Sequence, residues 1–191
     1  MHRDIKPNNI LIEDQQPILA DFGLARIADE AAASLAQPSS SPPTASFARL
    51  DCTAGAGTLP YMAPEQCTGA PVGEYTDVYA IGAVLYEMLT GRWLFDVPTA
   101  RKFAECIVSR APLPPSARRR SLPESVDAVV MQCLEKGPRR RFAGMEELWR
   151  ALEGVYEEVT GTWLFTQVTN YGAPSPPFYD YPRSEWGADR D

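Results

Sequence analysis

The segment His2-Arg3-Asp4-Ile5-Lys6-Pro7-Asn8-Asn9 opens the chain, and the triplet Asp21-Phe22-Gly23 begins twelve positions after its last residue. A third short segment, Ala63-Pro64-Glu65, follows later. Between the first two, the apolar runs 10–12 and 17–20 are separated by four polar residues, a pattern typical of a small β-hairpin. We therefore expect one hairpin to hold two charged, chemistry-bearing segments close together.

These three segments resemble, in the same order, the catalytic loop (H-R-D-[LI]-K-P-x-N), the D-F-G motif and the A-P-E motif of eukaryotic-type (Hanks-type) serine/threonine protein kinases. Each segment alone is short, but the ordered set around a predicted hairpin is specific. The resemblance extends to about residue 155. It implies a protein-kinase-like α+β fold of which this chain is the C-terminal lobe, mostly α-helical, with a small β-hairpin that carries the catalytic loop and the D-F-G motif.

The resemblance and the composition together divide the chain. Residues 1–158 are expected to form a partial protein kinase domain, from the catalytic loop to the last C-lobe helix, with the N-lobe, the hinge and the preceding helix absent. Within it, 28–56 is rich in Ala, Ser, Pro and Thr and reads as a long flexible activation-loop insertion, because such a segment buries little apolar surface. Residues 159–191 form a Pro, Gly and aromatic C-terminal tail.

Helical periodicity appears after the insertion. A helix is expected over 77–90, with Asp77 as its N-cap and Gly91 at its end. Further helices are expected over 99–110 and from about 123. A last helix is expected to present one apolar face, made of Met145, Leu148, Trp149, Leu152, Val155, Tyr156 and Val159. The 77–90 helix is apolar on nearly every side, which is typical of a helix at the centre of a helical domain.

The kinase resemblance assigns chemistry to four side chains. Phosphoryl transfer needs positioned groups and neutralised charge. Asp4 would accept the proton of the substrate hydroxyl, and Lys6 would contact the transferred phosphoryl group. Asn9 and Asp21 would hold the Mg²⁺ ions that bridge the phosphates of ATP, since hard cations take oxygen ligands. Lys6 followed by proline favours protein substrates with serine or threonine acceptors.

Four further residues would support the site. Thr58, in the loop 57–66 that faces the substrate, would tie that loop to the catalytic aspartate and lysine. Glu65 would form a buried ion pair with Arg141, and Asp77 would also bond the backbone of the catalytic loop.

Arg3, beside the catalytic aspartate, would pair with a phosphate on the activation loop and so order that loop. Thr53 is the first candidate phosphosite. Weaker candidates are Ser39, Ser40, Ser41, Thr44 and Ser46. An unmodified linker remains an equal alternative for these.

Composition narrows the class of protein. The net charge of -7 argues against a nucleic-acid-binding protein. The 4 cysteines lie far apart and the chain has 1 histidine, so neither a zinc site nor a disulfide framework is indicated. The longest apolar run, 78–89, is shorter than the roughly 20 residues of a membrane span. We expect a soluble, cytoplasmic protein.

Three interpretations stay open. In the first, the chain is a truncated piece, or a late-start gene model, of an active serine/threonine kinase, and is inactive alone because it lacks the Gly-rich strand pair, the strand lysine and the helix glutamate of the N-lobe. In the second, it is a noncatalytic, pseudokinase-like binding or regulatory module, which the intact catalytic residues disfavour. In the third, a separate chain supplies the N-lobe.

Overall fold

The computed structural model describes residues 1–14, 16–21 and 57–161. The described elements are, in chain order, η1 (Pro7–Asn9), β1 (Ile10–Glu13), β2 (Gln16–Leu19), η2 (Leu59–Tyr61), α3 (Pro64–Thr68), α4 (Glu74–Thr90), α5 (Ala100–Ser109), α6 (Pro115–Arg118), α7 (Glu124–Cys133), η3 (Pro138–Arg140) and α8 (Met145–Thr160). The described part is therefore mostly helical with one small sheet.

The expected hairpin is confirmed. Strands β1 and β2 pair antiparallel, with Ile10 opposite Leu19 and Glu13 opposite Gln16. Asp14 in the connection has φ 48°, a left-handed conformation that Asp tolerates better than most residues. Three large apolar side chains of the hairpin face solvent, namely Leu11, Ile12 and Ile18. The sheet thus presents apolar surface that no described residue covers.

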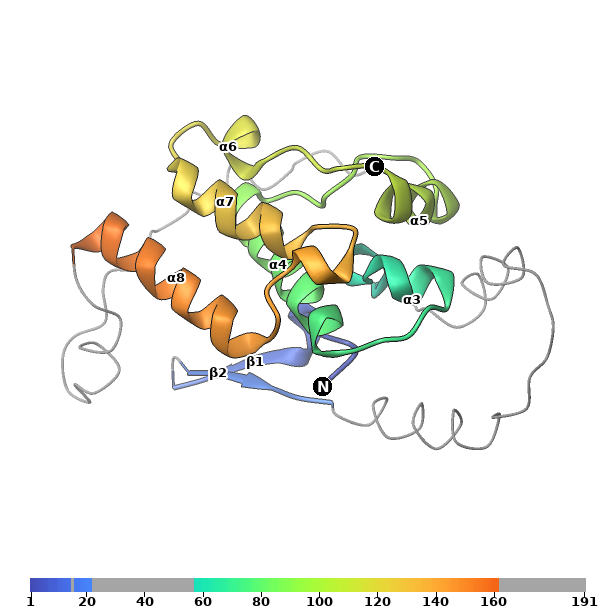
Figure 1. Cartoon of the computed structure of the whole chain (residues 1–191), viewed down its shortest axis with the longest axis horizontal. Helices are drawn as coiled ribbons and strands as arrows, with labels where there is room; N and C mark the ends of the chain where they lie inside the picture. The colour runs from blue at the N-terminus through green and yellow to red at the C-terminus, as the bar shows by residue number, and fades with distance from the viewer. Residues whose placement is uncertain (15, 22–56, 162–191) are drawn as a thin grey trace.

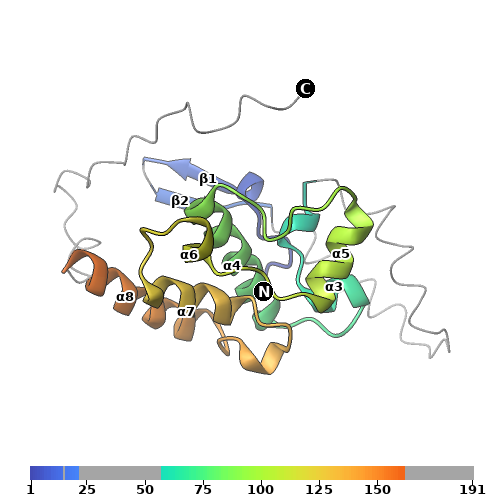
Figure 2. The same cartoon turned by 90° about the horizontal axis from the view of Figure 1, so that it is seen from above.

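Helix α4 lies at the centre of the helical part, with α7 and α8 on one side and α3 and α5 toward its N-terminal end (Figures 1 and 2). Its residue Gly82 allows close packing on α7, because a Cβ there would lie 2.4 Å from Cβ of Cys133. Most of α4 is buried, as its apolar sequence predicts, but Met88 near its C-terminal end is 66% exposed. Gly91 ends the helix with φ 67°, as expected from the sequence.

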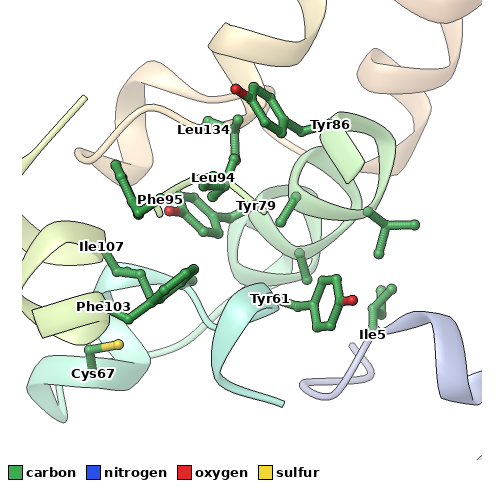
Figure 3. Packing of buried hydrophobic residues seen from close by; sticks show 14 of the residues in the cluster. Ile5, Tyr61, Cys67, Tyr79, Tyr86, Leu94, Phe95, Phe103, Ile107 and Leu134 are labelled. Atoms are coloured by element: carbon green, nitrogen blue, oxygen red, sulfur yellow. The ribbon is translucent and has the colours of Figure 1, made fainter. Parts of the chain in front are cut away.

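The main core joins α4 to α3, α5 and the segment 2–9. Tyr79 and Tyr86 of α4 are completely buried in it, and Phe95 and Phe103 meet edge to face with their ring centroids 5.7 Å apart. Figure 3 shows Tyr61 and Ile5 at the edge of this cluster, where the segment after the insertion meets the start of the chain. The core therefore fixes the segment 2–9 against the helical bundle.

The other expected helices are also confirmed. α5 begins after Thr99, whose side chain accepts a hydrogen bond from the backbone N–H of Lys102 at 3.3 Å, as a helix N-cap does. α7 begins after Pro123, and α8 covers the last expected helix. None of the helices in the described ranges is long and apolar enough to cross a membrane.

One detail of the helix prediction is wrong. Asp77 does not cap α4, because the helix begins three residues earlier at Glu74 and Thr76 accepts the N–H of the preceding Gly73 at 3.1 Å. The expected apolar face of α8 is only partly covered: Leu148 is buried, whereas Trp149 is 43% exposed. Helix α8 meets α4 and α7 along one edge, and Met145, Trp149 and Val159 on its apolar face stay exposed to solvent.

Candidate active site

The catalytic loop brings Asp4, Lys6 and Asn9 together. Oδ2 of Asp4 lies 2.8 Å from Nζ of Lys6, and it accepts a hydrogen bond of 3.0 Å from Nδ2 of Asn9. The same amide nitrogen donates to the backbone carbonyl of Asp4 at 2.8 Å. Asp4 and Asn9 are buried. One carboxylate oxygen of Asp4 is therefore fixed by two donors.

The other carboxylate oxygen of Asp4, Oδ1, is buried and has no hydrogen-bond partner among the described residues. A buried oxygen without a donor is costly unless a donor reaches it during function.

Thr58 connects the loop 57–66 to the segment 2–9. Nζ of Lys6 donates to Oγ1 of Thr58 at 2.8 Å while it also contacts Asp4. An ammonium group has three N–H donors, so one remains for a further acceptor. Thr58, Lys6 and Asp4 therefore form a continuous chain of polar contacts.

Asp21 is held next to this cluster through its neighbour Ala20. The backbone N–H of Ala20 donates to the carbonyl of Asn9 at 2.7 Å, and the carbonyl of Ala20 lies 3.0 Å from Nε2 of His2. Nδ1 of His2 accepts from the N–H of Asp4 at 3.4 Å, so we assign the proton to Nε2. The side chain of Asp21 is exposed.

Arg3 and Asp21 both have left-handed backbones, with φ 71° and 66°. Such a conformation is unfavourable for side chains with a Cβ and persists where surrounding contacts enforce it. For Arg3 the contact comes from Asp77, whose Oδ1 accepts the N–H of Arg3 at 2.7 Å and whose Oδ2 accepts the N–H of His2 at 2.6 Å. The buried Asp77 therefore ties α4 to the catalytic loop.

Glu65 and Arg141 form a buried, two-pronged ion pair. Nη1 and Nη2 of Arg141 each lie 2.8 Å from one carboxylate oxygen of Glu65. The guanidinium also donates to the carbonyls of Tyr75, Glu135 and Lys136, and Thr76 donates to Glu65 at 2.8 Å. Burial by itself would raise the pKa of Glu65. The hydrogen bonds that the carboxylate accepts, first of all from Arg141, together with the charge of Arg141 outweigh burial and hold that pKa below its usual value.

Gln66 and Glu87 also hold separate segments together, although the sequence did not single them out. Nε2 of Gln66 donates to the carbonyl of Arg3 at 2.9 Å, and Oε1 of Gln66 accepts the N–H of Ala63 at 2.9 Å. The hydroxyl of Tyr61 donates to Oε2 of Glu87 at 2.5 Å. A glutamine beside the A-P-E motif and a glutamate in an apolar helix look like surface residues in sequence, so no local signal identified them.

Several predicted residues lie outside the described residues. They are Phe22 and Gly23 of the D-F-G motif, the insertion 28–56 with the candidate phosphosites Thr53, Ser39, Ser40, Ser41, Thr44 and Ser46, and most of the tail 159–191.

The donor set fits magnesium and nucleotide phosphates. Asn9 uses its amide nitrogen on Asp4, which leaves its amide oxygen for a ligand. Asp21, which follows the residue bonded to the Asn9 carbonyl, adds an exposed carboxylate. Mg²⁺ is commonly bound by one or two such oxygens together with substrate phosphates. The described ranges contain no group of three or more His, Cys, Asp and Glu that could hold a metal by themselves.

Comparison with known proteins agrees with this geometry. The family described as protein kinase domain matches residues 1–151. The chain belongs to the protein kinase family. Within that family it is similar to serine/threonine kinases: the chain is 37% identical over 148 residues to the probable serine/threonine-protein kinase PknB of Bifidobacterium longum, and 36% identical over 149 residues to PknB of Mycobacterium tuberculosis. A probable serine/threonine-protein kinase of Clostridium acetobutylicum is 31% identical over 183 residues. This kinase chain is therefore of the Hanks-type serine/threonine class.

These matches cover 77%, 78% and 92% of the kinase chain, in the order given, but only 19%, 22% and 25% of the relatives. The chain thus spans a quarter or less of the length of the curated relatives it matches.

Proposed function

We propose that this chain is the C-terminal lobe of a serine/threonine protein kinase and supplies the half of the active site that receives the substrate hydroxyl. The observation that carries the proposal is the environment of Asp4. One of its carboxylate oxygens is held by Lys6 and Asn9, while the buried Oδ1 has no donor in the described part of the chain. A substrate hydroxyl would supply the donor that this oxygen lacks.

Each residue then has one role. Asp4 orients the serine or threonine hydroxyl of a protein substrate and accepts its proton through Oδ1. Lys6 remains within reach of Thr58 and Asp4 and offers its third N–H to the transferred phosphoryl group, whose charge it offsets. Thr58 keeps the substrate-facing loop in register with the catalytic loop.

ATP with Mg²⁺ supplies the phosphoryl group when bound. Asn9 and Asp21 would hold the metal, because both offer oxygen atoms and both are attached to the same end of the hairpin. Asp77, through its bonds to two backbone N–H groups, keeps the catalytic loop rigid, which phosphoryl transfer requires because its catalysis is mainly positioning.

We further propose that the chain requires additional kinase elements for activity. The Gly-rich strands and strand lysine that the family uses on ATP are not found within these 191 residues. The exposed apolar side chains of Leu11, Ile12 and Ile18 are the surface on which those elements would pack. The alternative is a noncatalytic, pseudokinase-like module.

The insertion would regulate the site. We propose Thr53 as the phosphorylation site and Arg3 as a residue that the phosphate engages, on the kinase resemblance alone. Phosphopeptide mapping of active kinase should recover phosphorylated Thr53. Active protein in which Thr53 is always unmodified would contradict this assignment.

The test of function is phosphorylation of a serine peptide with radiolabelled ATP and Mg²⁺. Two proteins are compared: the 191-residue chain, and a fusion in which the N-lobe of Mycobacterium tuberculosis PknB precedes Met1. We expect transfer only by the fusion, and loss of transfer in the fusion with Asp21→Ala. A folded fusion that binds ATP but transfers nothing would favour the noncatalytic module. Transfer by the 191-residue chain would show that it needs no further elements.

A further inference from the structure

The side chain of Gln66 contacts the backbone immediately before Asp4. Its Nε2 donates to the carbonyl of Arg3 at 2.9 Å. That carbonyl and the N–H of Asp4 belong to one peptide group, and the N–H donates to Nδ1 of His2 at 3.4 Å. Because a peptide group is planar, a contact at each of its two ends fixes its orientation. The peptide group that leads into Asp4 is therefore held by Gln66 on one side and by His2 on the other.

The other end of the Gln66 amide is fixed to helix α3. Its Oε1 accepts the backbone N–H of Ala63, the residue before the helix, at 2.9 Å. This contact caps the first turn of α3, and the same turn carries Glu65, which forms the buried ion pair with Arg141. Gln66 thus connects a helix that a buried ion pair anchors to the peptide group before Asp4.

Only an amide satisfies both partners of this side chain. A backbone N–H can only donate and a carbonyl can only accept, so the two contacts fix which end of the Gln66 amide is the oxygen. A glutamate would keep the acceptor for Ala63 but would lose the donor for Arg3. A residue that only capped α3 could equally be glutamate. The contact with Arg3 is therefore the one that requires glutamine.

The backbone around Arg3 needs such support. Arg3 has φ 71°, a left-handed conformation that is unfavourable for a residue with a Cβ and persists where surrounding contacts enforce it. Asp77 of α4 accepts the N–H of Arg3 at 2.7 Å, on the peptide group before this residue. Gln66 of α3 holds the peptide group after it. Side chains from two different helices thus hold the two peptide groups that flank Arg3.

We infer that Gln66 is a positioning residue for Asp4: it fixes the peptide group that orients the Asp4 carboxylate, and so makes phosphoryl transfer depend on the placement of α3. The inference rests on the proposed function, which assigns the hydroxyl proton to Asp4. It adds a second connection between the loop 57–66 and the catalytic residues, separate from the contact of Thr58 with Lys6. Because positioning dominates the catalysis of phosphoryl transfer, a small rotation of the carboxylate slows the reaction without weakening substrate binding.

The first experiment measures amide hydrogen exchange of the 191-residue chain, which requires neither nucleotide nor transfer. In Gln66→Glu we expect exchange of residues 2–4 to be about fivefold faster than in wild type, the effect of one lost hydrogen bond on a local opening. Exchange of residues 63–68 should stay the same, because the substitution keeps the acceptor for the N–H of Ala63. The matched control is Gln132→Glu on the exposed side of α7, which should change neither region.

The second experiment measures transfer to a serine peptide by the fusion with the PknB N-lobe. Gln66→Glu should lower kcat by about 10- to 100-fold and leave KM for ATP and for the peptide unchanged, because the residues proposed to contact either are intact. A side chain that only stabilised the fold would instead change the urea midpoint and leave kcat of the folded enzyme as it is. Gln66→Met has a similar length and neither polar group, and it replaces Gln66→Glu if that variant does not fold; it should speed exchange in both regions and lower kcat in the same way.

Two results would overturn the inference. They are unchanged exchange of residues 2–4 in the folded Gln66 variant, and a kcat equal to that of Gln132→Glu in an active fusion. A fusion of wild-type sequence that transfers nothing would count against the proposed function, and the exchange rates would then decide the role of Gln66 alone.

Discussion

Removal of the Arg141 guanidinium should be among the most destabilising single changes in this chain. The side chain of Arg141 is completely buried and makes five hydrogen bonds, and the side chain of Glu65 is nearly completely buried. Arg141→Ala leaves the Glu65 carboxylate buried without its cation, which costs about 3 to 5 kcal/mol of the unfolding free energy. For a chain of this size that corresponds to a fall of roughly 10 °C in the melting temperature.

Urea unfolding followed by circular dichroism measures this cost. Glu65→Ala should cost a similar amount, and the double variant should cost less than the sum of the two, because each single variant leaves one buried charge unpaired. The control is Arg150→Ala on α8, where Arg150 pairs with Glu146 but both side chains are more than 70% exposed, so the expected change is within about 0.5 kcal/mol. Equal effects of Arg141→Ala and Arg150→Ala would refute the reasoning.

The same pair predicts a dependence on pH. The pKa of Glu65 in the folded chain is lower than its ordinary value of 4.5. Its contribution to stability is therefore complete above pH 4.5 and is lost as the pH falls through the lower folded pKa. The difference in unfolding free energy between wild type and Glu65→Gln should shrink over that acidic range. A difference that stays constant would contradict the assignment.

Three other changes test the packing and the loop. Gly82→Ala should lower the unfolding free energy by about 1 to 3 kcal/mol, because the new Cβ would meet that of Cys133. Gly154→Ala, on open helix surface, should raise it by about 0.5 to 1 kcal/mol. Equal urea midpoints of the two variants would contradict this. Burial lowers the pKa of Lys136 to about 8, whereas a lysine in the unfolded chain keeps its proton up to about pH 10.5. Between these pH values the unfolding free energy of wild type should therefore rise relative to that of Lys136→Met. A difference that does not change with pH would contradict this prediction. Asp77→Asn places an amide N–H₂ against backbone donors of the catalytic loop and should cost about 1 to 3 kcal/mol by thermal unfolding, and an unchanged midpoint would argue against its role.

Local patterns predicted the elements of the fold. The hairpin follows from two apolar runs around a polar turn, and the end of α4 at Gly91 follows from a residue that adopts a left-handed backbone easily. These signals lie within a few residues of the structure that they predict. The family resemblance added the residues of the catalytic loop, which the structure brings into contact.

Long-range contacts account for what the sequence could not predict. Aspartate is a residue type that commonly caps helices, so Asp77 was predicted as an N-cap. Its carboxylate instead accepts hydrogen bonds from backbone N–H groups 74 and 75 residues away, and the helix begins earlier. Gln66 and Glu87 gain their roles only from loops that reach them in the fold. The helical spacing of apolar residues predicted which face of α8 is apolar. It could not predict which part of that face another element covers.

The most direct test of the account is the single-turnover rate of phosphoryl transfer to a serine peptide by the fusion with the PknB N-lobe, compared between Asp4→Asn and Asp14→Asn. The two substitutions are chemically identical, but Asp14 lies exposed in the hairpin turn, away from the cluster. The account predicts that Asp4→Asn slows transfer by about 10² to 10⁴-fold, the usual contribution of a general base, while Asp14→Asn leaves it unchanged. Equal rates for the two variants would contradict the assignment of Asp4 as the residue that receives the hydroxyl proton.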